Sequence, residues 1–357
     1  MQIKSLKILV VGCGSVGRRH AKNAYSLGAE ISLCDSNKDR ISSLAKDVNA
    51  KVCFSSYEEA ALTSDADAVV ISTPSNLHAL PAKIFIEKHK HIFMEKPLCM
   101  DLESAYELRA QLNQTHVVFM MAHTYRFRDE WIKIKRLINK LDMGKINSAE
   151  SLGGWYLPDW HIHENYRHEY AAQRKMGGGV LTTGLSHIFD LIIWLFGDIE
   201  KIIGSKMRLG NLDIDVDDTI VCTMKTDKGI SVTIIEDFLS RSPRRTLRIN
   251  TEYGYMKVDF NKQNIKIWDS RDKRFLPNTR NELNNSSFFK VLEDGVLYDL
   301  KEDKTKLEYS GNDAYVKEME HFFNLISNQD VCHDLDIDSG IKVLECICSS
   351  EIKDWQA

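Results

Sequence analysis

The chain lacks the features that would mark it as a membrane protein or a nucleic-acid-binding protein. No uninterrupted apolar run reaches the roughly 18 residues that a membrane-spanning helix needs. Asp plus Glu number 51 against 47 for Lys plus Arg, a net charge of −4. So small an imbalance provides no strong field to steer a nucleic acid or an anionic lipid surface. We therefore expect neither a nucleic acid nor a membrane as partner.

Proline is also scarce, and the cysteines show no disulfide pattern. The 357 residues include 6 Pro and 8 Cys, and the cysteines show no even framework of close spacings. The N-terminal residues lead straight into the strand-like run Ile8–Val11, without an apolar leader and a small-residue cleavage site. These absences favour reduced thiols and a cytoplasmic location. With 43% hydrophobic and 27% charged residues, the composition is that of a folded globular protein long enough for two domains.

The first third of the chain alternates short β-rich runs with longer amphipathic segments. This alternation is typical of βαβ units and a parallel sheet. The runs are nearly continuous in apolar residues, which indicates strands that are buried on both faces. They are Ile8–Val11, Ile31–Cys34, Val52–Phe54, Ala68–Ser72, His91–Met94 and Val117–Met121. We predict an N-terminal, doubly wound Rossmann domain over residues 1–125.

The later part of the chain has a different pattern. Runs such as 229–234 and 255–260 alternate apolar with polar residues, the period of an antiparallel sheet that is covered on one face. One strong helix is expected at Leu185–Phe196, ended by Gly197. We predict an α+β domain over residues 126–340, with an open, mostly antiparallel sheet. A C-terminal helix, residues 341–357, is expected to pack back on the core.

A dinucleotide fingerprint follows the first predicted strand. Gly12, Gly14 and Gly17 have the G-x-G-x-x-G spacing between a strand and a helix. Gly12 permits a tight turn, Gly14 lets backbone amides approach a pyrophosphate at the helix N-terminus, and Gly17 allows the helix to pack closely on the strand. Ser15 and Val16 begin that helix. These five residues are predicted to bind the cofactor.

Asp35 stands 18 residues past Gly17, at the end of the second strand, where it can accept hydrogen bonds from an adenosine ribose. Its charge would repel a 2′-phosphate, which favours NAD over NADP. Arg18 and Arg19 keep NADP open as an alternative, since a nearby arginine would pair with that phosphate.

Three further blocks carry a family resemblance. They are Thr73-Pro74-Ser75-Asn76-Leu77-His78, Glu95-Lys96-Pro97 and the stretch Gly177–Asp190. Together with the fingerprint, they resemble the glucose–fructose oxidoreductase, inositol dehydrogenase and rhizopine-catabolism (Gfo/Idh/MocA) family over essentially the whole chain. The resemblance implies an oxidoreductase that moves a hydride between NAD and a secondary hydroxyl or ketone of a sugar, polyol or sugar nucleotide. It also implies a homodimer or homotetramer formed through the C-terminal sheet.

The resemblance assigns roles to individual residues. Lys96 takes the position of the family lysine that contacts the substrate oxygen, and His187 takes the acid/base position. Ammonium and imidazole groups suit these roles, because one stabilises developing negative charge and the other exchanges protons near neutral pH. The residues implied to line the cofactor are Ser72, Thr73, Pro74, Asn76, His78, Glu95, Lys96 and Pro97.

Two positions depart from the family pattern. Thr183 stands where the family often has an aspartate, so it could hydrogen-bond a substrate hydroxyl but could not carry charge. Thr124 replaces an asparagine before Tyr125 and Arg126. An aromatic- and arginine-rich segment between Gly153 and Gly177 is the expected specificity loop, because aromatic faces stack on sugar rings and arginine suits phosphate. The predicted substrate-binding residues are Tyr125, Arg126, Trp160, Tyr166, Arg167, Arg174, Thr183 and His187.

Alternatives stay open at this stage. Thr183 is compatible with an NAD-binding regulator that has lost turnover, and distant relatives reduce non-sugar rings or imines without needing His187. His161 and His163 match no closed zinc spacing, so no metal is expected.

Overall fold

The computed structural model describes residues 6–140, 142–160, 164–271, 290–293, 296–297, 312–328 and 333–355. The chain forms two compact units. Unit 1 consists of Met1–Arg128, Lys175–Gly177 and Gly311–Cys348. Unit 2 consists of Asp129–Arg174, Gly178–Ser310 and Ser349–Ala357.

Unit 1 contains a six-stranded parallel sheet in the order β3-β2-β1-β4-β5-β6. This is the doubly wound Rossmann sheet that the sequence predicts, so that part of the predicted fold is confirmed. The strands are β1 (Lys7–Val11), β2 (Glu30–Cys34), β3 (Cys53–Phe54), β4 (Ala68–Ile71), β5 (His91–Met94) and β6 (Phe119–Met121). The helices between them are α1 (Ser15–Ser26), α2 (Lys38–Asp47), α3 (Tyr57–Thr63), α4 (Ala79–Glu87) and α5 (Leu102–Leu112).

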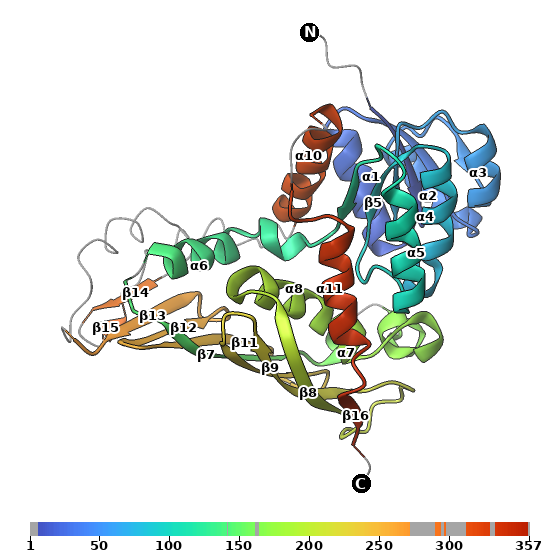
Figure 1. Cartoon of the computed structure of the whole chain (residues 1–357). Helices are drawn as coiled ribbons and strands as arrows, with labels where there is room; N and C mark the ends of the chain where they lie inside the picture. The colour runs from blue at the N-terminus through green and yellow to red at the C-terminus, as the bar shows by residue number, and fades with distance from the viewer. Residues whose placement is uncertain are drawn as a thin grey trace. The chain divides into compact units, whose positions relative to one another are not determined.

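Two C-terminal helices complete the core of unit 1. Helix α10 (Asp313–Ser327) packs against α1, and α11 (Ile337–Ile347) packs against α5; both are drawn in red in Figure 1. Phe322 belongs to the hydrophobic cluster that contains Ile8 and Val10, whereas Ile341 belongs to the cluster that contains Leu9. Because successive strand residues point to opposite faces, each helix covers a different face of the parallel sheet.

This arrangement differs from the expected domain boundaries. Residues 312–328 and 333–340 were expected in the second domain, but they group with unit 1 because their apolar faces bury against its sheet. The expected final helix over 341–357 instead ends at Ile347, and β16 (Ile352–Asp354) adds a parallel strand to the sheet of unit 2.

Unit 2 is built on a ten-stranded sheet in the order β15-β14-β13-β12-β11-β7-β10-β9-β8-β16. Most neighbours are antiparallel, and β7–β10, β13–β14 and β8–β16 are parallel pairs, which confirms the mostly antiparallel sheet. The strands are β7 (Ile146–Gly154), β8 (Ile199–Met207), β9 (Thr219–Thr226), β10 (Ser231–Asp237), β11 (Arg244–Thr251), β12 (Gly254–Asp259), β13 (Asn264–Asp269), β14 (Lys290–Glu293), β15 (Val296–Leu297) and β16.

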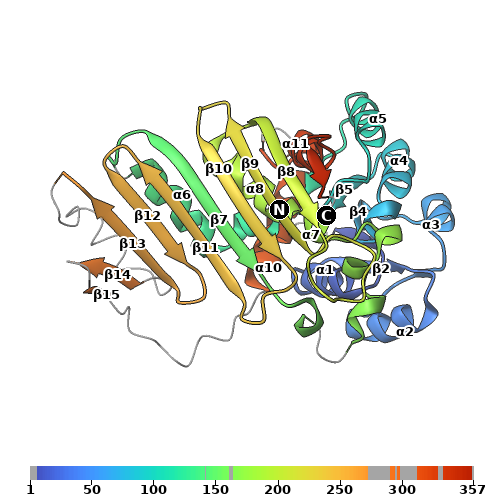
Figure 2. The same cartoon turned by 90° about the horizontal axis from the view of Figure 1, so that it is seen from below.

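Helices α6 (Asp129–Lys140) and α8 (Leu185–Phe196) lie over one face of this sheet, as Figures 1 and 2 show. They contact each other where the Lys135 ammonium lies 3.9 Å from the centre of the Trp194 ring. Helix α8 has its predicted bounds, and Gly197 ends it at φ +106°, a conformation that favours glycine. The uncovered face of the sheet carries none of the described helices of unit 2.

Among the described residues, no single helix is long and apolar enough to cross a membrane. The bent pair Arg174–Thr183 and Leu185–Phe196 meets the requirements only when the two segments are taken together, and most of its second segment is buried in unit 2.

Candidate active site

The glycine-rich loop after β1 has the geometry of a pyrophosphate cradle. Gly12 has φ +94°, and a Cβ there would lie 2.6 Å from the Ser72 carbonyl oxygen. A Cβ on Gly17 would overlap the Gly12 carbonyl, so helix and loop touch only because both residues are glycines. Gly14 is the N-cap of α1, no side chain caps the helix, and the space beside its Cα is open. Backbone N–H groups at such an uncapped helix start suit a cofactor phosphate.

Asp35 follows β2 and faces this loop. Its Oδ2 accepts a hydrogen bond from the Cys13 N–H at 2.7 Å, and its Oδ1 accepts from the Asn37 N–H at 2.8 Å. A carboxylate has about four acceptor positions, so two ribose hydroxyls could still bind to it. The geometry fits the adenosine end of a dinucleotide, and these residues could hold NAD there.

The block after β4 makes hydrogen bonds within the chain. The Ser72 hydroxyl donates to the Gly12 carbonyl at 2.9 Å, so it holds the glycine loop in place. Thr73 Oγ1 donates to the Leu77 carbonyl at 3.1 Å, and Pro74 precedes the short 3₁₀ helix Ser75–Leu77. Asn76 is exposed on that turn. Their predicted contacts with the cofactor stay predictions.

His78 joins two of the motif blocks. It is 1% exposed, with Nδ1 2.8 Å from the Pro97 carbonyl oxygen and Nε2 2.9 Å from the Thr73 carbonyl oxygen. Burial lowers the pKa of His78, and the two carbonyl partners oppose that shift. A neutral imidazole has a single N–H, so it donates to one carbonyl at a time. His78 therefore ties the loop after β4 to the loop after β5.

Glu95 and Lys96 follow β5. Glu95 is buried, and its Oε1 lies 2.7 Å from Nε2 of His20, while its Oε2 accepts from the Lys96 N–H at 3.1 Å. Burial by itself raises the pKa of Glu95, but the hydrogen bond and charge of His20, together with Lys96, bring that pKa below its usual value. The carboxylate thus fixes the backbone at Lys96, whose peptide bond to Pro97 is cis. The Lys96 side chain is partly buried.

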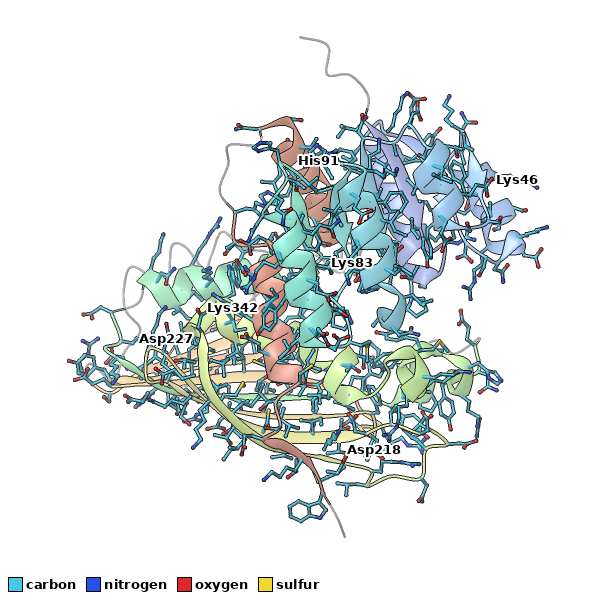
Figure 3. All side chains as sticks on the ribbon, turned by 45° about the vertical axis from the view of Figure 1, so that its right-hand side comes forward. Lys46, Lys83, His91, Asp218, Asp227 and Lys342 are labelled. Carbon is cyan, nitrogen blue, oxygen red and sulfur yellow. The ribbon has the colours of Figure 1, made fainter. Side chains whose placement is uncertain are left out.

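In unit 2, the glycine block is held by an acid that the sequence did not single out. Gly179 has φ +106°, and Asp217 Oδ2 accepts from the Leu181 N–H at 2.9 Å at the start of α7 (Val180–Thr183). Burial raises the pKa of Asp217. The neighbouring Asp218, labelled in Figure 3, is 1% exposed and accepts from the backbone N–H groups of Leu209 and Gly210.

Thr183 and His187 lie at the α7–α8 junction. Thr183 is buried, and its hydroxyl donates to the Gly179 carbonyl at 2.5 Å, so its single donor is already engaged within the chain. His187 is partly buried in the first turn of α8. Residues 183 and 187 are four apart and so lie on the same side of the helical segment.

The predicted arginines of the specificity segment are engaged with acids of their own unit. Arg167 Nε donates to Asp213 Oδ2 at 2.7 Å, and Tyr166 accepts from the Asp213 N–H at 3.2 Å. Arg174 Nε and Nη2 donate to the Asp215 carbonyl at 3.2 and 3.0 Å. Both guanidinium groups are exposed, so a ligand anion could still approach them.

The remaining predicted substrate residues have different surroundings. Trp160 packs edge-on against Phe238, with ring centres 5.2 Å apart. Tyr125 is partly buried, with the Arg128 guanidinium 4.3 Å from its ring centre. Arg126 is buried, and its Nη1 lies 2.9 Å from the backbone carbonyl oxygen of Asp334 and 3.1 Å from Oδ2 of the same residue. This position ties Arg126 to the segment that precedes α11.

The described residues contain no group of three or more His, Cys, Asp or Glu that could hold a metal ion. His161 and His163 lie outside the described residues.

The sequence is similar to a known family in both units. Residues 6–123 match the oxidoreductase family with an NAD-binding Rossmann fold, and residues 131–257 match the GFO/IDH/MocA C-terminal domain. The chain belongs to the Gfo/Idh/MocA family. The resemblance predicted from the motif blocks is thereby confirmed.

The chain is also similar to individual curated proteins, at low sequence identity. The UDP-N-acetylglucosamine 3-dehydrogenase of Acidithiobacillus ferrooxidans is 24% identical over 259 residues, 72% of this chain and 75% of that protein. The inositol 2-dehydrogenase 1 of Paenarthrobacter aurescens is 26% identical over 211 residues, 58% of each chain. The chain spans about half the length, 53 to 59%, of other curated relatives that it matches.

A solved structure has a similar fold. The WlbA dehydrogenase of Bordetella pertussis, in complex with NADH and UDP-GlcNAcA, is similar with a TM-score of 0.74. The alignment covers 98% of this chain and 97% of that chain at 20% identity. At this identity the likeness establishes that the two chains share a fold.

Proposed function

We propose that this protein is an NAD-dependent oxidoreductase that interconverts a secondary hydroxyl and a ketone on a sugar, polyol or sugar nucleotide. The observation that carries the proposal is the anchored loop at Lys96. Glu95 accepts a hydrogen bond from the Lys96 backbone N–H, and His78 lies within hydrogen-bond distance of the Pro97 carbonyl oxygen. Both contacts belong to unit 1, which also contains the cofactor cradle. A lysine on a loop whose backbone is held in place after β5 is what the family's chemistry requires of this position.

Each residue has a defined part in the proposed reaction. When bound, NAD supplies the nicotinamide that accepts the hydride leaving the substrate carbon. Lys96 donates a hydrogen bond to the substrate oxygen, and its charge stabilises the negative charge that develops there. His187 takes the hydroxyl proton, so one alcohol yields one ketone, one hydride and one proton. In the reverse direction, His187 returns the proton and Lys96 holds the ketone oxygen.

The experiment that tests this function is a panel of substrates with purified protein and NAD, followed by nicotinamide fluorescence. The panel contains myo-inositol, levoglucosan, UDP-N-acetylglucosamine and its uronic acid, because similar proteins are named for acting on or binding these compounds. Formation of NADH with one compound supports the proposal and names its substrate class. If NAD and NADH both bind, but no alcohol or corresponding ketone changes the cofactor, the NAD-binding regulator becomes the better reading.

Asp35 is proposed to select NAD. We expect Asp35→Asn to weaken NADH binding by about 10- to 100-fold, because hydrogen bonds to a charged group contribute about 1.5–3 kcal/mol. Asparagine keeps one carbonyl oxygen that can accept the Cys13 N–H. The ratio of NADPH to NADH affinity should rise, since the negative charge is gone. Arg18 and Arg19 already have other contacts, with Asp47 and the Tyr315 ring respectively, which supports the NAD preference.

Fluorescence titrations with both reduced cofactors measure the effect of Asp35→Asn, with the exposed Asp39→Asn as the control. Equal NADH affinity in the two variants would contradict the assignment of Asp35.

A sugar-nucleotide substrate is proposed from the arginines of the specificity segment. If Arg167 and Arg174 bind its phosphates, replacing both with Ala should raise the KM for UDP-N-acetylglucosamine by about tenfold or more. The KM for myo-inositol should change far less, because inositol has no phosphate. Steady-state kinetics on both compounds measure the difference, with the exposed neighbour Lys175→Ala as control. Equal effects on the two substrates argue against a nucleotide.

The uncovered face of the unit 2 sheet is proposed to pair with a second copy of the chain. Ile203 on β8 and Val221 on β9 are exposed on neighbouring strands, and their register places them on the same face. A second copy of the chain that pairs with this face would remove both aliphatic side chains from water. Light scattering on the purified protein measures whether it forms the expected homodimer or homotetramer.

A further inference from the structure

Glu236 is a carboxylate on the core-facing side of the unit 2 sheet. It lies on β10, two residues beyond Ile234, which is fully buried on the same face. A Cβ on Gly153 of β7 would overlap Oε2 of Glu236, so the carboxylate lies directly over a position that has no side chain. The glycine therefore leaves the space beside β7 that the Glu236 carboxylate occupies.

The same carboxylate lies beside the junction that carries His187. A Cβ on Gly184, the N-cap of α8, would be 3.5 Å from Cγ and 3.9 Å from Oε1 of Glu236. Residues 184 and 187 are three apart, so they share one side of the helix start. Thr183 precedes Gly184 directly. Glu236 thus approaches the segment in which Thr183 replaces the family's aspartate.

No donor within the described residues satisfies Glu236. It makes no hydrogen bond or ion pair with them, and the charges acting on it are those of Arg245, Asp237 and Arg244. Desolvation raises the pKa of Glu236 to about 7, and the two arginines oppose this shift. The adjacent Asp237, by contrast, accepts from two backbone N–H groups and from Arg244 Nη2 at 2.9 Å.

Cross-strand register explains why Arg245 acts on Glu236 without binding it. Arg245 on β11 pairs with Gly153 on β7, and β10 lies on the other side of β7. The position of Gly153 therefore separates the Arg245 guanidinium from the Glu236 carboxylate. The carboxylate is left with acceptor positions that the described residues do not fill, and Glu236 is partly exposed, so a ligand can reach them.

Unit 2 contains another polar atom that lacks a partner in the described part of the chain. The indole Nε1 of Trp160 is buried without a hydrogen-bond partner among the described residues. Trp160 packs against Phe238, two residues after Glu236. A ligand hydroxyl can donate, so it can fill an acceptor position of Glu236 that the described residues leave open.

We propose that Glu236 is a substrate-binding carboxylate, which accepts a hydrogen bond from a hydroxyl group of the substrate and supplies the acid that Thr183 does not provide. This inference rests on the function proposed above and adds to it one recognition residue. The inference requires that the substrate carry a free hydroxyl group in addition to the one that is oxidised. Proton exchange with the reacting hydroxyl stays with His187.

Two variants remove this contact in different ways. Glu236→Gln removes the charge and keeps the shape, whereas Gly153→Ala keeps the acid but displaces it. We expect each to raise the KM of the panel compound that the wild type oxidises by about 10- to 100-fold, the range for a hydrogen bond to a charged group. The dissociation constant of NADH should stay within about twofold. Glu87→Gln, the same change on an exposed residue of α4, is the control.

A second measurement does not depend on turnover. Glu236 holds its proton more tightly in the folded than in the unfolded chain, so stability falls as the pH rises from about 4.5 to about 7. In Glu236→Gln, the stability should fall less over this pH range, because the titrating carboxylate is gone. Thermal unfolding of the wild type and of Glu236→Gln at pH 5 and pH 8 measures this difference. The other charged and titratable groups near Glu236 are the same in both proteins; they are Arg244, Arg245, Asp237 and His187 of the facing helix.

Binding is measured by the same unfolding assay with each panel compound and NADH added. We expect at least one compound to stabilise the wild type more than Glu236→Gln. If none does, or if Glu236→Gln and Glu87→Gln have the same KM, the assignment of Glu236 is wrong. Failure of the wild type to turn over any compound contradicts the proposed oxidoreductase instead, and the binding comparison still decides the role of Glu236.

Discussion

Lys96→Ala should lower kcat by about 100- to 1,000-fold while NADH binds almost as tightly as to the wild type. Loss of a donor that stabilises developing charge on oxygen has an effect of this size. The cofactor cradle is built from Gly12, Gly14 and Asp35, none of which the substitution touches. Steady-state kinetics on the panel compound and NADH titration by fluorescence measure the two quantities.

Lys83→Ala is the matched control for Lys96→Ala. Lys83 lies on α4 of the same unit, is labelled in Figure 3, and forms an ion pair with Glu107 on the surface. Its replacement should leave kcat unchanged. Retention of full turnover by Lys96→Ala would remove the central residue of the proposed mechanism. A wild type that binds NAD but has no turnover to lose is instead the result expected of a regulator.

His187→Ala should lower kcat by about 100- to 10,000-fold in the oxidation of a hydroxyl, the range for removal of a general acid or base. Its place in the first turn of α8 means that alanine keeps the helix, so the protein should still fold. The exposed His116→Ala in unit 1 is the control. Unchanged activity of His187→Ala would favour the alternative chemistry, reduction of a non-sugar ring or imine.

The double variant Lys96→Ala/His187→Ala tests whether the two residues serve one step. Residues that act together show losses that are far from additive. We expect the double variant to lose little more than the worse of the two single variants. Fully additive losses would mean that Lys96 and His187 act in independent steps.

Much of unit 1 was predictable because its signals are local. Apolar runs such as Ile8–Val11 reveal buried strands by their composition alone, and the glycines at 12, 14 and 17 reveal the turn by their spacing. Helix α8 was likewise predicted with its bounds, since it is apolar and Gly197 ends it. Such features depend on neighbours within a few residues, which the sequence lists in order.

Contacts between distant residues were not predictable in this way. His20 meets Glu95 across 75 residues, and Arg126 meets Asp334 across 208. Nothing in the local pattern of His20 on α1 indicates a carboxylate partner. In the structure, His78 and His20 hold the loop at Lys96, and the predicted place of His78 beside the cofactor stays a prediction.

The amino-acid sequence by itself determined the parallel sheet, the glycine cradle, Asp35 and the family, because each depends on residue type at short spacing. Only the tertiary structure decided that residues 312–328 and 333–348 complete unit 1 and that Glu236 lies beside Gly184. Both depend on burial of side chains against strands that are remote in the chain. Packing of this kind leaves no period or motif in the sequence, and it appears only when the sheets have formed.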